Sequence, residues 1–79
     1  MHSTLGAPDD ALLSAVLMKL FADRQLIPSP DTIPYLARRM ERSFGAAEEV
    51  VAEIDATALA RRRPITRGLA AQVLDNRGE

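Results

Sequence analysis

The sequence predicts an all-α protein, a small bundle of four helices. Apolar residues recur at helical spacing along most of the chain, and no segment alternates apolar and polar residues as a strand would. Prolines and capping residues interrupt this pattern and divide it into four helical stretches. With 79 residues, the chain holds one domain at most. A domain of this size has a small margin of stability.

The first helix is expected to begin near Pro8 and to fade near Gln25. Proline suits a first turn, and Asp9 and Asp10 complement the positive end of the helix dipole. Residues 1–7 before it are expected to form a flexible tail. The apolar face of this helix should consist of Leu12, Leu13, Val16, Leu17, Leu20 and Phe21.

The second helix must start within residues 30–34, because proline is tolerated only in a first turn. Ser29, Asp31 and Thr32 are candidate caps. Its buried stripe is expected to be Ile33, Leu36, Ala37 and Met40.

Ser43 is a natural N-cap for the third helix, which Pro64 stops, and Thr66 caps the fourth. The helical domain is therefore predicted over residues 8–74, followed by a frayed tail at 75–79. The buried positions are expected to be Phe44, Ala47, Val51, Ile54 and Ala58 in the third helix, and Leu69, Ala70, Val73 and Leu74 in the fourth.

Composition argues against most kinds of catalytic or binding site. The chain has no cysteine, and its one histidine, His2, lies in the expected tail, so disulfides, zinc sites and a Ser-His-Asp triad are not expected. A net charge of -1 disfavours a dedicated nucleic-acid binder. Glycine-rich phosphate-binding motifs are absent from the sequence. We therefore expect no enzyme activity and no cofactor bound by this chain alone.

The sequence also contains neither a membrane-spanning run nor a leader peptide. No apolar run approaches the roughly 20 residues that cross a bilayer. The first ten residues, MHSTLGAPDD, lack the basic start and apolar stretch of a signal peptide. A cytoplasmic location without membrane attachment is the resulting expectation.

The order of three segments resembles a known domain. KLFADRQL ends the first helix, YLARRMERSF spans the second helix and the start of the third, and RPITRGLAAQVL introduces the last. Together they resemble the helical lid of the AAA+ domain in the DnaA/Hda family, and are most similar to Hda-type regulatory inactivators of alphaproteobacteria.

The resemblance implies a role in controlling replication initiation. In such proteins the lid packs over a nucleotide held by a preceding α/β half, and Hda in its ADP form, bound to the sliding clamp, promotes hydrolysis of ATP held by DnaA. The implied partners are its own nucleotide-binding half, DnaA and other copies of itself. Because the chain has neither Walker motifs nor a clamp-binding motif, ADP or ATP and the clamp are expected only through a missing front part. No helix-turn-helix domain follows the fourth helix, which favours Hda over DnaA.

One position departs from the family pattern. The resemblance aligns Gly45 with the sensor-two arginine, which reaches the nucleotide phosphates in these lids. That arginine is therefore missing, and we expect nucleotide sensing to be weakened while the packing role persists. Arg42 is either a relocated phosphate contact or a solvated arginine before the cap.

Other charged or aromatic residues have both an ordinary and a functional interpretation. Arg38 and Arg39 either contact a partner AAA+ subunit or form a polar face, and Phe44 with Tyr35 belongs to the core or to an interface. The run Arg61–Arg63 either complements the helix dipole or touches nucleic acid. Glu48 and Glu49 are adjacent, so they diverge on a helix and make a poor metal or acid–base pair.

Two other functions compete with the lid. An apolar face that a lid turns to its parent domain could instead be buried in a twin, which would make the chain a free-standing interaction module or homodimer. A small helix-turn-helix DNA binder is a third possibility, which the slightly acidic balance disfavours.

Overall fold

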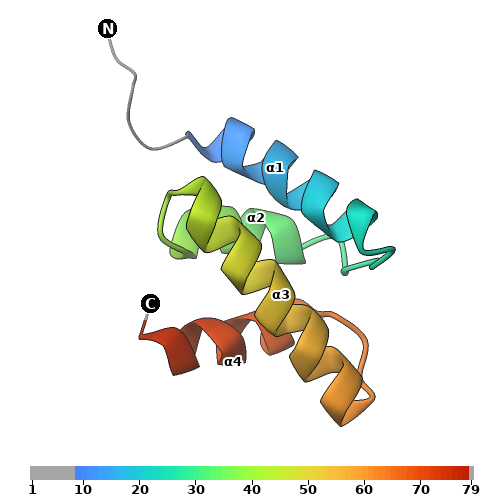
Figure 1. Ribbon diagram of the computed structural model, residues 1–79. Coiled ribbons are helices and arrows are strands. Elements are labelled where there is room, and N and C mark those ends of the chain that lie inside the picture. Colours follow the sequence, from blue (N-terminus) through green and yellow to red (C-terminus); the bar gives the residue numbers. More distant parts are fainter. Residues whose placement is uncertain (1–8, 79) are drawn as a thin grey trace, which may run out of the picture.

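The protein is all-helical over residues 9–78, the part of the chain that the computed structural model describes. It contains four helices and no strand there (Figure 1): α1 (Asp10–Asp23), α2 (Thr32–Arg39), α3 (Phe44–Arg61) and α4 (Arg67–Arg77). The predicted fold class, a small four-helix bundle, is confirmed. The expected tail at residues 1–7 and His2 lie outside the described residues.

The four helices surround one core in a closed ring. α1 packs against α2 and α3, and α4 packs against the same two helices. α1 and α4 are not neighbours, and neither are α2 and α3. Each helix therefore has two helical neighbours, and the core lies where all four meet.

Three of the four helix starts are set by a side-chain cap. The backbone N–H of Leu12 donates to Asp9 Oδ1 at 2.8 Å. At α3 and α4, the predicted caps Ser43 and Thr66 are confirmed. Their hydroxyl oxygens accept from backbone N–H groups at 3.0 Å and 3.2 Å, respectively. These bonds satisfy donors that a helix end leaves unpaired.

α2 begins differently, through a turn before its first residue. Asp31 is the N-cap residue but makes no side-chain cap bond. Instead, the N–H of Thr32 donates to the carbonyl of Ser29 at 3.0 Å. Pro34 is the third helical residue, where its missing N–H leaves no hydrogen bond unmade. The prediction that the prolines confine the start of this helix is confirmed.

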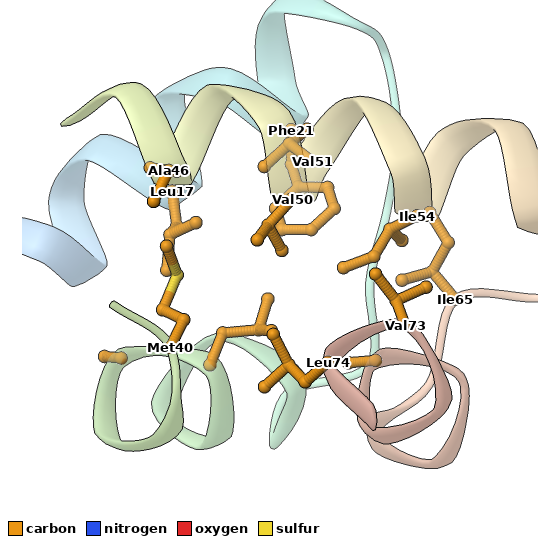
Figure 2. Packing of buried hydrophobic residues seen from close by; sticks show 14 of the residues in the cluster. Leu17, Phe21, Met40, Ala46, Val50, Val51, Ile54, Ile65, Val73 and Leu74 are labelled. Carbon is orange, nitrogen blue, oxygen red and sulfur yellow. The ribbon is translucent and has the colours of Figure 1, made fainter. Parts of the chain in front are cut away.

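The core is aliphatic apart from one phenylalanine, Phe21. In Figure 2, side chains from α3 point toward Val73 and Leu74 of α4 and toward Met40. Thr32 is the only buried polar residue of the described part, and its hydroxyl is hydrogen-bonded to Ser29. The fully enclosed members are Leu13, Leu17, Leu36, Ala47, Val50, Ile54 and Ala70.

Two predictions about the core are wrong. Phe44 is 49% exposed, because it is the first residue of α3 and extends past the rim of the bundle. Ala46 and Val50 are buried in its place. Leu12 is 48% exposed for the same reason, since it lies in the first turn of α1.

The predicted frayed tail is also wrong for residues 75–77. These residues continue α4 to Arg77, and Gly78 ends the helix with φ at 82°. Arg77 bonds to two carboxylates of α3, Glu49 at 3.1 Å and Glu53 at 2.6 Å. Its side chain is only 18% exposed, so these ion pairs hold the last turn against α3.

Candidate functional site

The sequence-predicted site residues lie at one corner, where α2 ends and α3 begins. This corner is joined to the start of α1, because the Arg42 guanidinium forms an ion pair with the Asp10 carboxylate. Figure 1 shows the start of α1 on the same side of the molecule as the α2–α3 connection. We call this region, made of Asp10 and residues 38–45, the α3 corner.

Gly45 is exposed in the first turn of α3, with open space around it. A Cβ added there would meet no atom within 4 Å. Phe44, beside it, offers a half-exposed aromatic ring. The corner therefore presents an apolar ring and bare backbone, a surface on which another protein can pack closely.

Arg38 and Arg39 occupy the last turn of α2, and both are exposed. The Arg39 guanidinium carbon lies 5.5 Å from the centroid of the Tyr35 ring, a cation–π contact. Tyr35 is partly buried and packs against the core, so it is not available as a stacking platform. Neither Arg38 nor Arg39 makes an ion pair within residues 9–78, whereas Arg42, the third arginine of this corner, pairs with Asp10.

The α3 corner does not fit a nucleotide phosphate. Gly45, where the resemblance predicts that a sensor arginine has been lost, has no side chain, and the Arg42 guanidinium is paired with the Asp10 carboxylate. A phosphate contact needs an arginine fork free to donate hydrogen bonds. Packing against a protein surface is the chemistry that these residues can perform.

The second arginine cluster, Arg61–Arg63, lies partly in α3 and partly in the turn that follows it. α3 ends at Arg61, whose guanidinium donates to Gln72 Oε1 on α4. Arg62 has φ at 54° and ends the helix, and Arg63 lies beyond it. Arg62 and Arg63 form no ion pair with any residue of the described part. The three arginines 61–63 were expected to complement the dipole of this helix, but only Arg61 lies in it.

The structure adds a feature that the sequence analysis missed, an apolar groove between α1 and α2. It has a volume of about 490 Å³. Met18 and Ile27 form its exposed walls, and Phe21 and Ile33 also line it. A second groove, of about 330 Å³, lies across Ile27 against the end of α3 and is lined by Leu59 and Arg63. The sequence feature that could have indicated these grooves is Ile27, an isoleucine within a proline-rich connector.

The first groove contains almost no free polar group. Ser29 is one of two serines that line it. Its hydroxyl donates to Asp31 Oδ1 at 2.7 Å and lies 2.7 Å from the hydroxyl of Thr32. This hydrogen bond from Ser29 lowers the pKa of the Asp31 carboxyl below its ordinary value, with a smaller contribution from Arg67. The Ser29 hydroxyl is therefore already hydrogen-bonded within the protein, and the groove suits apolar side chains of a ligand.

Comparison with known proteins does not decide the family. Neither a protein-family model, nor a curated protein, nor a solved structure matches this chain. The resemblance to DnaA/Hda lids therefore stays a prediction.

No helix within residues 9–78 is long and apolar enough to cross a membrane. Within the same residues no three acidic or histidine side chains gather as metal ligands would. Glu49 pairs with Arg77, and Glu48 is exposed on its own.

Proposed function

We propose that this chain is the non-catalytic helical lid of a DnaA-related AAA+ regulator of replication initiation, of the Hda type, acting in the cytoplasm. Its partner within the parent protein is a preceding α/β half that holds ADP or ATP. The lid packs on that half without contacting the phosphates, and the assembled protein acts on ATP-bound DnaA. The sliding clamp is reached only through the part before this lid.

One observation carries the proposal. The Arg42–Asp10 ion pair places the start of α3 beside the start of α1. A domain joined to the chain before α1 would therefore lie next to Gly45 and Phe44. This is the side on which a AAA+ lid meets its nucleotide-binding half, and the exposed ring and bare backbone favour close packing there. The order of capped helices agrees with the same family.

The first test is the size of the native protein in its source cells, by immunoblot with an antibody raised against this chain. We expect a band far above 8.6 kDa, and mass mapping of that band should find a Walker-type sequence before the lid. A band at 8.6 kDa alone would contradict the proposal.

The second test restores the missing arginine in that parent protein. Gly45→Arg should tighten ADP binding by about tenfold, because a charge-assisted hydrogen bond contributes about 1.5–3 kcal/mol. Isothermal titration with ADP measures this, and Ala56→Arg, at an exposed position later in α3, is the matched control. Equal affinity of the two variants would remove Gly45 from the nucleotide site.

A homodimer is the second candidate, and the apolar side chains exposed at the starts of α1 and α3, Leu12 and Phe44, favour it. Large unpartnered apolar surfaces often mark protein–protein contacts. Light scattering on the purified chain separates the two cases, since a mass of twice 8.6 kDa indicates a dimer and a mass of 8.6 kDa a monomer.

A further inference from the structure

We infer that the two grooves beside Ile27 bind a segment of another protein that is apolar on one face and carries carboxylates next to that face. The binding surface consists of both grooves and of the ridge between them, formed by Leu26 and Ile27. It lies at the opposite end of α1 from the α3 corner. The inference therefore does not depend on the proposed function.

Exposed apolar side chains gather on this surface. Met18, Ile27 and Leu59 are 60%, 91% and 77% exposed, respectively, and each lines one or both grooves. Single exposed apolar residues are common on soluble proteins, but contiguous apolar patches mark binding surfaces. These three are among the five large hydrophobic residues that are exposed in the described part of the chain.

The ridge is held in place by hydrogen bonds on both of its sides. The N–H of Leu26 donates to the carbonyl of Phe21 at 2.8 Å. The N–H of Ser29 donates to the carbonyl of Ile65 at 2.9 Å, which ties the α1–α2 connector to the α3–α4 connector. Ile27 is thus presented to solvent by a fixed backbone, and a partner does not have to order it on binding.

The charges at the edge are complementary to an acidic partner. Asp55 lines the second groove, but its carboxylate is paired with Arg24 at 2.9 Å. Arg63 lines the same groove, and Arg62 precedes it, and neither has an ion-pair partner within residues 9–78. The edge therefore presents unpaired positive charge beside apolar walls, and carboxylates of a partner would be attracted to it.

The shape favours a peptide segment over other occupants. Grooves on both sides of a ridge require a ligand with apolar groups on each side of it, which a helix or strand with one apolar face supplies. A nucleic acid would find a largely apolar lining and few cations. A second copy related by two-fold symmetry would bring its own Arg62 and Arg63 into the same interface.

The probe is a displayed library of random 15-residue peptides, panned against the 79-residue chain. Selected peptides should be enriched in Leu, Ile and Phe and in Asp and Glu, and should bind in fluorescence anisotropy. Ile27→Ser should weaken their binding by about tenfold or more, since burying one isoleucine side chain contributes that much affinity. The variant keeps its fold, because Ile27 contacts mainly solvent.

A double variant tests whether Arg62 and Arg63 attract the carboxylates of the peptide. Arg62→Ala with Arg63→Ala should weaken the selected peptides by up to about fivefold at low salt, and the difference should shrink at high salt. Leu12→Ser and Arg38→Ala, exposed residues of the same types at the other end of the molecule, are the controls and should bind like the unaltered chain.

Three results would overturn the inference. The first is a set of peptides with no acidic enrichment, and the second is equal binding to Ile27→Ser. The third is a chain mass of twice 8.6 kDa by light scattering that returns to 8.6 kDa in Ile27→Ser, which would assign the surface to a second copy.

Discussion

Gly45 lowers the stability of the helix that contains it, and nothing in the fold requires a glycine there. Its φ lies outside the left-handed region, and no atom occupies the space of an added Cβ. Glycine in a helix is less favourable than alanine by about 1 kcal/mol. A residue that the fold does not need points to a requirement from outside the domain, such as close packing by a partner.

Gly45→Ala is therefore expected to raise the free energy of unfolding by about 0.5–1 kcal/mol. Urea unfolding followed by circular dichroism at 222 nm measures the change. Gly78→Ala is the matched control and should lower stability, because its φ of 82° is strained for any side chain. A loss of stability in Gly45→Ala would mean that the fold itself selects the glycine.

Among single residues, the sequence predicted those that act on near neighbours in the chain. Ser43 and Thr66 cap helices through atoms three residues away, and both were identified. Phe44 was placed in the core although it is half-exposed, and the exposure of Ile27 was not predicted, because exposure depends on where a neighbouring helix ends. Asp10 as the partner of Arg42 could not be read from the sequence either, since the contact joins two separate elements.

Two helices end on residues that are strained at their position. Gln25, just after α1, has φ at 60°, and Arg62, which ends α3, has φ at 54°. Most helices place glycine at such a left-handed position, because a side chain there costs about 1 kcal/mol. Arg62 makes no ion pair within residues 9–78 and directly precedes Arg63, which lines the second groove.

Arg62→Gly is expected to stabilise the domain by about 1 kcal/mol in thermal or urea unfolding. The adjacent Arg61→Gly should instead destabilise it by about 1 kcal/mol, because that residue is helical and bonds to Gln72. If both changes had the same sign, α3 would not end where the structure places its last residue.

The ends of the elements show how far a local pattern reaches. Prolines and caps gave the start of every helix to within a few residues, since these signals act within one turn. The end of α4 was misplaced, because its last turn is held by Glu49 and Glu53 from another helix. Ion pairs between residues that lie 24 and 28 positions apart in the chain produce no periodic pattern in the sequence.

For the whole molecule, α2 is the shortest helix, and its packing decides whether the bundle closes. Leu36 is fully buried at its centre. A leucine-to-alanine change in a core costs about 2–5 kcal/mol, and the unfolding free energy of a domain of this length is only about 4–12 kcal/mol in total.

Leu36→Ala is accordingly expected to leave a large fraction of the chain unfolded at 37 °C, measured by circular dichroism and amide proton dispersion. Leu59→Ala, a change of the same size at an exposed position, should leave stability nearly unaltered. A fully folded Leu36→Ala would show that α2 contributes little to the core.

The class of the fold followed from periodicity, but the binding surface did not. Helical spacing identifies four amphipathic segments, and these can bury their apolar faces only against each other. The grooves arise where two connectors meet, at Ser29 and Ile65, and their shape depends on how the helices are arranged. Only tertiary structure brings these residues together.

The closed ring of helices has a consequence for how the domain comes apart. Removing any one helix would leave an open row, in which the two terminal helices each retain a single neighbour. No set of two or three helices encloses a complete hydrophobic core, so a partly unfolded state has little stability. The molecule is therefore expected to unfold cooperatively, as small domains usually do. A protease or chaperone would therefore meet either an intact bundle or an unstructured chain. A partner that binds one corner would protect all four helices at once.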